Sequence, residues 1–312
     1  PPLGCSSSFS TATGAAFAGL ASFWPLLVVA FVGTLNPSSG DVSVFLPLEH
    51  ARLASAATGH ARTALYARYS LAGALSAAVG ALAAALPPWL AAHAGVPLET
   101  GLRAMFALYG VIGALVWWLY RRLPAPARGV DAAPAPLGPS RPVVVRLAAL
   151  FSIDAFAGGL VVNALLALWL FERFGLSLGQ AGLFFFTTGL LSAGSQLAAA
   201  PVARRFGLLN TMVYTHIPSS LCLIGAAFAP ALPLALGLLF VRSALSQMDV
   251  PTRTAFVMAV VTPAERTAAA SFTTVPRSLA AAASPALAGA WFAAGWLAAP
   301  LVACGGLKIA YD

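Results

Sequence analysis

The chain contains 312 residues, of which 60% are hydrophobic and 8% are charged, and its formal net charge is +8. A soluble domain carries roughly 25% charged residues, so this composition excludes a protein whose surface is covered by water. Several apolar runs reach the roughly 20 residues that a helix needs to cross a bilayer about 30 Å thick. The composition therefore predicts an all-α membrane protein, built as a polytopic helical bundle.

Ten apolar segments predict membrane spans along the chain. The first four cover residues 10–23, as a partial span, and then residues 25–46, 62–86 and 102–120. The other six cover residues 144–171, 178–200, 208–228, 232–250, 264–292 and a segment that starts near residue 298. The chain starts with Pro1 and its last apolar segment stops at Asp312, so we expect a piece of a longer protein, cut at both ends.

A long polar loop divides the chain. Residues 121–143 are rich in Pro, Ala and Arg. Such a stretch buries little apolar area and predicts a flexible linker. It separates a first half-bundle of about four spans, residues 1–120, from a second half-bundle of about six spans, residues 144–312.

The two halves contain a weak internal repeat. Phe31-Val32 corresponds to Phe240-Val241, Arg62-Thr63 corresponds to Arg266-Thr267, and Asp41 falls beside Asp249. A repeat of this kind between membrane segments is typical of a transporter built from two related halves.

Basic residues are unevenly distributed between the loops that these spans create. With the linker inside, the inner loops hold Arg52, Arg62, Arg121, Arg122, Arg128, Arg141, Arg146, Arg204, Arg205, Arg253 and Arg266, and the outer loops hold Arg103 and Arg173. Cytoplasmic loops carry the excess of Lys and Arg, so the linker is predicted to be cytoplasmic. This topology explains the positive net charge, and no nucleic-acid partner is expected. The dominance of Arg over Lys and the many alanines favour a bacterial source, and hence the inner (plasma) membrane.

Two inner loops resemble motifs of one family. The segment APVARRFGLLNT, residues 200–211, resembles the degenerate second copy of the loop motif G-x-L-A-D-R-x-G-R-R of the major facilitator superfamily. Ala203, Arg205 and Gly207 match this motif, whereas Arg204 stands at its acidic position. The segment VVTPAERTAAAS, residues 260–271, is similar to the family's inner loop before its eleventh span. Together with two related halves around a basic loop, these segments make the whole chain resemble that superfamily.

The resemblance implies a fold of twelve transmembrane helices, of which about ten are present, and a secondary active transporter. Such a protein moves a small solute by alternating access, here with protons as a candidate coupling ion, and is expected to be a monomer in the lipid bilayer. One departure concerns the superfamily's proton antiporters, which carry an Arg in the fourth span. The repeat places Gly33 there, while the second copy keeps Arg242. A non-transporting sensor or receptor of the same fold and a membrane-embedded enzyme remain the alternatives.

Polar side chains within the spans are the candidate site for solute or ions, because each is costly at bilayer depth. They are Asp154, Arg242, Arg277, Arg68, His216 and Asn163. Asp154 is either a protonatable or solute-contacting acid, or the structural partner of Arg242 or Arg277. These two arginines can bind an anionic or zwitterionic solute. His216 can relay protons or pack in the core, and Asn163 can hydrogen-bond between helices.

A second group of residues is predicted to control conformational change. The group consists of Asp41, Asp249, Arg204, Arg205 and Gly207. The two aspartates lie at inner span ends, where Asp249 can pair with Arg204 or Arg205. The three cysteines and the spacing of Glu49, His50 and His60 indicate neither a disulfide framework nor a metal site. No phosphate-binding G-x-x-x-x-G-K-[ST] segment occurs, so we expect no cofactor and no ATP-driven step.

Overall fold

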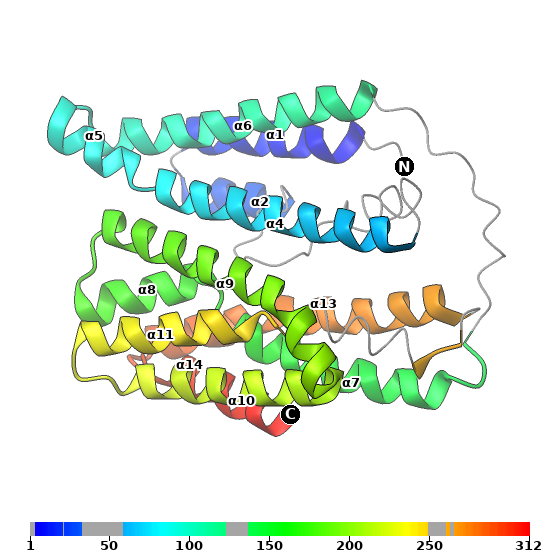
Figure 1. Cartoon of the computed structure of the whole chain (residues 1–312). Helices are drawn as coiled ribbons and strands as arrows, with labels where there is room; N and C mark the ends of the chain where they lie inside the picture. Colours follow the sequence, from blue (N-terminus) through cyan, green and yellow to red (C-terminus); the bar gives the residue numbers. More distant parts are fainter. Residues whose placement is uncertain (1–3, 21, 33–58, 123–136, 249–259, 263–264) are drawn as a thin grey trace. The chain divides into compact units, whose positions relative to one another are not determined.

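The computed structural model of the chain describes residues 4–20, 22–32, 59–122, 137–248, 260–262 and 265–312 (Figure 1). Its contacts divide the chain into two compact units. The first unit comprises residues 1–65, 80–129 and 178–183, and the second comprises residues 66–79, 130–177 and 184–312. These units are not the same as the predicted half-bundles, residues 1–120 and 144–312, so the half-bundles remain a prediction.

The first unit is built on two helices that pack along each other, α1 (Gly4–Gly19) and α6 (Leu98–Arg122). At their closest approach, a Cβ atom added at Gly14 would lie 2.6 Å from Cα of Gly110, so only glycine fits there. Helix α2 (Phe23–Val32) follows α1 and contacts it.

A short helix of the first unit, α5 (Leu86–Ala94), was not predicted as a separate element. The preceding helix α4 (Gly59–Ala83) ends before the pair Pro87-Pro88, which cannot continue a helix but favours the first turn of a new one. Gly95 ends α5 with φ of 67°, a left-handed conformation that suits glycine.

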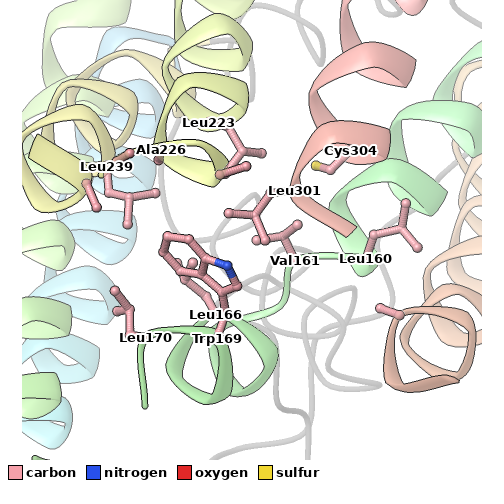
Figure 2. Packing of buried hydrophobic residues seen from close by; sticks show 14 of the residues in the cluster. Leu160, Val161, Leu166, Trp169, Leu170, Leu223, Ala226, Leu239, Leu301 and Cys304 are labelled. Atoms are coloured by element: carbon pink, nitrogen blue, oxygen red, sulfur yellow. The ribbon is translucent and has the colours of Figure 1, made fainter. Parts of the chain in front are cut away.

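The second unit holds most of the buried core. Its helices are the middle of α4, α7 (Arg141–Gly159), α8 (Asn163–Phe174), most of α9 (Leu178–Phe206), α10 (Leu208–Ala227), α11 (Leu232–Ser246), α13 (Arg266–Ala293) and α14 (Ala299–Tyr311). Helix α13 packs along α7, α10 packs against α11 and α14, and α14 packs against α7. Trp169 of α8 lies in the core among Leu223 of α10 and Leu301 of α14 (Figure 2).

The predicted span over residues 144–171 is interrupted. Helix α7 ends at Gly159 and α8 begins at Asn163, with Val162 in an extended conformation between them. Gly158 and Gly159 lower the helix propensity directly before the break. The interruption therefore separates two helical stretches within one apolar segment.

Four stretches in the described part of the chain are helical, long and apolar enough to cross a membrane. They are Leu71–Ala94, Leu98–Leu119, Arg141–Phe174 and Leu178–Phe206. Helices α11 and α14 are apolar but shorter. The all-α membrane fold is thus confirmed, while the count of ten spans remains a prediction.

Candidate functional site

Four ionisable side chains from three helices of the second unit meet in one buried cluster. The cluster consists of Asp154 on α7, His216 on α10, Lys308 on α14 and Asp312 directly after α14. The Lys308 ammonium donates a hydrogen bond to Oδ1 of Asp154 at 2.5 Å. Its Nζ also lies 3.2 Å from Nε2 of His216, which is itself 3.8 Å from Oδ1 of Asp154.

The opposite edge of the imidazole faces the second carboxylate. Nδ1 of His216 lies 3.0 Å from Oδ1 of Asp312, in hydrogen-bonding geometry, and 2.8 Å from its Oδ2. The ring of Tyr311 stands edge-on to His216, with the ring centroids 6.1 Å apart. His216 is therefore bracketed by an ammonium group on one side and a carboxylate on the other.

The side chains of the cluster are largely buried, so the pairing of their charges matters for stability. The side chains of Asp154, His216 and Asp312 are 7%, 3% and 2% exposed, and that of Lys308 is 16% exposed. Charges removed from water are costly unless they are paired and hydrogen-bonded. The ion pair between Asp154 and Lys308 meets this requirement, and the Asp312 carboxylate faces the imidazole of His216 in hydrogen-bonding geometry.

Close helix packing positions the cluster. A Cβ atom added at Gly305 would lie 2.9 Å from the carbonyl oxygen of Ser220 and would overlap the side chain of Ile224, so glycine lets α14 approach α10. Gly305 precedes Lys308 by three residues, which places both on the same side of α14. The contact of α14 with α7 then places Lys308 beside Asp154.

Arg242 of α11 lies in the same neighbourhood. Cys304 of α14 is fully buried, and it interacts electrostatically with Lys308, Arg242 and Asp154. In one of its two interpretations of Asp154, the sequence analysis predicted that this residue pairs with Arg242 or Arg277. The structure forms an ion pair between Asp154 and Lys308, a residue that the sequence analysis did not select, and pairing of Asp154 with an arginine stays a prediction.

The other predicted site residues lie on helices other than α7, α10 and α14. Arg277 is exposed on α13, and Asn163 is the half-buried first residue of α8, directly after the interruption. Arg68 lies within α4. The structure brings Asp154 and His216 together, with Arg242 nearby, and does not place Asn163 or Arg277 in the cluster contacts given above.

The predicted gate residues are only partly described. Asp41 and Asp249 lie outside the described residues, so their pairing stays a prediction. Arg204 and Arg205 are exposed in the last turn of α9, and the Arg205 guanidinium lies 5.5 Å from the ring centroid of Phe206. Gly207 joins α9 to α10 with φ of 85°, a conformation that strongly favours glycine at this motif position.

Comparison with known proteins decides the family. The family model of the Major Facilitator Superfamily matches residues 3–285. The chain belongs to the major facilitator superfamily. The chain is also similar to an uncharacterized membrane protein of Saccharomyces cerevisiae, with 24% identity over 313 residues, covering 89% of this chain and 70% of the relative. This assignment confirms the resemblance that the loop motifs indicated, and it indicates a membrane transporter.

Solved structures support the superfamily fold. The chain is similar to two crystal structures of a bacterial homologue of the human lysosomal transporter Spinster, both inward-facing, one unoccupied and one occupied. The TM-scores are 0.64 and 0.63, with 16% and 18% sequence identity, and each match covers 99% of this chain and 78% of the other chain. At this identity the likeness concerns the fold.

A second polar contact joins two helix starts in this superfamily chain. The carboxylate of Glu265, the residue before α13, accepts hydrogen bonds from the backbone N–H of Gly138 and, at 2.7 Å, from the Thr262 hydroxyl. The Ser140 hydroxyl also bonds to Glu265 and accepts a 3.4 Å hydrogen bond from the backbone N–H of Thr262. Hydrogen bonds from Ser140, Thr262 and Gly138 lower the pKa of Glu265 to about 2. The end of the linker before α7 is thereby fastened to the start of α13.

Sequence reasoning missed Lys308 and Asp312. Lys308 is the chain's single lysine beside sixteen arginines, and it stands in the apolar run LVACGGLKIAY. A lone charge in a segment of membrane-like composition is a signal that could have identified it.

Proposed function

We propose that this protein is a secondary active transporter that moves a small solute by alternating access and couples this movement to protons at the buried cluster. The observation that carries the proposal is the cluster itself, in which Asp154, His216, Lys308 and Asp312 are gathered from α7, α10 and the end of α14. The superfamily assignment supports transport of a small solute, and the cluster supports the choice of the proton.

The cluster suits a proton-coupled step for a chemical reason. Ionisable residues inside a membrane protein commonly mark solute or proton pathways. The Asp154 carboxylate and the His216 imidazole share one ammonium group there, and Asp312 faces the other ring nitrogen, so the uptake of a proton must redistribute their contacts. A pair that only held α7 against α14 would not require the imidazole of His216 between Lys308 and Asp312.

Alternating access would use the two related halves. In transporters built from repeats, one bundle moves against the other around a site near the bilayer midplane. We propose that Arg242, Arg277, Arg68 and Asn163 contribute contacts to an anionic or zwitterionic solute. We further propose that Asp41 and Asp249, with Arg204, Arg205 and Gly207, bias the transporter between its two states.

The proposal extends to the membrane in which the protein lies and to its orientation there. We propose a monomer in a bacterial inner membrane, with the linker at residues 121–143 on the cytoplasmic side. The uneven distribution of arginines between the loops supports this orientation.

Reconstituted transport tests the proposal. The full-length protein in proteoliposomes is assayed for uptake of a panel of small solutes, with and without a proton gradient. We expect gradient-driven uptake that is lost in Asp154→Asn, while solute exchange without a gradient persists. Glu99→Gln is the matched control, because Glu99 is an exposed carboxylate on α6 that pairs with Arg103. Solute binding without movement in either direction would instead support a sensor.

A further inference from the structure

Each ring nitrogen of His216 contacts a charged group, and these contacts define its protonation. Nδ1 faces the carboxylate of Asp312, which can only accept a hydrogen bond when ionised, so Nδ1 carries a hydrogen. Nε2 faces the ammonium of Lys308, which can only donate, so Nε2 presents its lone pair. The contacts therefore correspond to a neutral imidazole protonated on Nδ1, a tautomer assigned from its partners.

A proton on Nε2 is incompatible with this position of Lys308. Protonation converts Nε2 from an acceptor into a donor, so the hydrogen bond from Lys308 is lost. It also places two positive groups about 3.2 Å apart, where they repel each other. Oδ1 of Asp154 lies 3.8 Å from Nε2 and can accept a hydrogen bond from the new N–H group.

We infer that Nε2 of His216 binds the coupled proton and that this proton enters by displacing the Lys308 ammonium. One N–H bond forms at Nε2, Lys308 keeps its three hydrogens, and Asp154 becomes the acceptor for the imidazolium. Lys308 then moves away from His216, and with it the end of α14. The inference rests on the proposed function in one respect, namely that the proton bound here is the one that drives transport.

Several charged and ionisable groups surround His216 and influence the exchange of Lys308 for a proton at Nε2. Asp154 faces it from α7, and Lys308, Tyr311 and Asp312 face it from α14 and the residue after it. Cys304 of α14 and Arg242 of α11 belong to the same electrostatic neighbourhood. Arg277 on α13, which packs along α7, is exposed. Asp312 stays hydrogen-bonded to Nδ1 in both protonation states, so Nε2 is the nitrogen that changes.

The protonation of His216 can be observed directly. The chain has four histidines, so the full chain with His50, His60 and His93 replaced by Gln leaves His216 as a single reporter. His93 is exposed on α5 of the first unit, where its ring nitrogen lies 3.0 Å from the carbonyl oxygen of Trp89. Ring-¹⁵N histidine labelling in lipid nanodiscs then reports by NMR which nitrogen carries hydrogen as the pH is lowered. We expect the Nδ1–H tautomer at high pH and hydrogen on both nitrogens at low pH.

Two variants test the displacement in opposite directions. Lys308→Met removes the competing ammonium, so we expect the NMR signal of the doubly protonated ring of His216 to appear at a higher pH than in the single-histidine protein. Asp154→Asn removes the acceptor for the imidazolium, so we expect that signal to appear at a lower pH. If one variant fails to fold, the other and the tautomer of the single-histidine protein still decide the matter. An Nε2–H tautomer at high pH, or proton binding that neither variant alters, would overturn the inference.

Transport assays separate this inference from the proposed function. Gradient-driven uptake that survives in His216→Gln would overturn the inference and leave proton-coupled transport standing. Uptake by the single-histidine protein that ignores the proton gradient would overturn the coupling in the proposed function. The NMR titration would then still report whether the Lys308 exchange exists as a property of the cluster.

Discussion

Gly159 of α7 lies directly against Ser284 of α13. A Cβ atom added at Gly159 would overlap the Ser284 hydroxyl and lie 2.7 Å from the carbonyl oxygen of Ala281. Gly159 is five residues after Asp154, so this contact holds the helix that carries the buried carboxylate. The space that glycine provides is therefore occupied by α13.

We predict that Gly159→Ala destabilises the protein by about 1–3 kcal/mol, because the added methyl group overpacks the contact between α7 and α13. Gly158→Ala is the matched control, since a Cβ atom there meets no other atom within 4 Å. Thermal unfolding in detergent measures both variants. Equal losses in the two variants would contradict the close contact at Gly159.

The contribution of the Asp154–Lys308 pair to stability can be measured separately from its proposed role in transport. Asp154→Asn leaves the ammonium of Lys308 without its carboxylate, a change that typically costs about 3–5 kcal/mol at a buried site. The double variant Asp154→Asn with Lys308→Met should recover most of this loss, because it leaves no unpaired charge. Thermal stability of the three variants tests the coupling. A double variant as unstable as the sum of the single variants would argue that the two residues do not interact.

The contact between Glu265 and the start of α7 predicts a pH dependence of stability. The folded-state pKa of about 2 lies below the ordinary value of about 4.5 for this carboxyl group. The contribution of Glu265 is therefore present above about pH 4.5 and is lost as the pH falls towards 2. We expect the melting temperature of the unmodified protein to fall more steeply over this range than that of Glu265→Gln.

The control for this pH dependence is Glu172→Gln, which changes an exposed carboxylate on α8. Its melting temperature should follow the unmodified protein across the pH range. Parallel profiles for the unmodified protein and Glu265→Gln would show that the hydrogen bonds to Glu265 contribute nothing to stability.

The gate role of Asp249 predicts a kinetic effect. Asp249→Asn should lower the transport rate and leave solute affinity nearly unchanged, because a gate residue biases conformational states and does not contact the solute. Transport kinetics and equilibrium solute binding are measured on the same preparation. A large loss of affinity at an unchanged rate would make Asp249 a solute ligand.

The distribution of arginines predicts the topology. Cysteines introduced at Arg128 and Arg204, in a chain whose native cysteines are replaced, should react only with a reagent added on the cytoplasmic side. A cysteine at Glu99 should react only from outside. Labelling of the Arg204 and Glu99 positions from the same face is incompatible with the predicted spans.

The sequence by itself determined the class of the protein and the approximate place of most of its helices. Few charges and long apolar runs leave a chain no other stable environment than a bilayer. The predicted spans at residues 178–200 and 208–228 correspond to α9 and α10, and the loop motif between them indicated the superfamily that the comparison confirms. These features are local, because hydropathy and turn chemistry depend on neighbouring residues.

Only the tertiary structure decided which charges meet. Asp154 and Lys308 are 154 residues apart, and Glu265 bonds to a linker residue 127 positions earlier. The periodicity of a helix predicts which face a residue occupies, but it contains no information on which other helix packs against that face. The sequence analysis did not predict the interruption between Gly159 and Asn163, for a related reason. Most residues around it are apolar, and the packing of Gly159 against α13 and the weak helix propensity of the glycine pair coincide with the end of the helix.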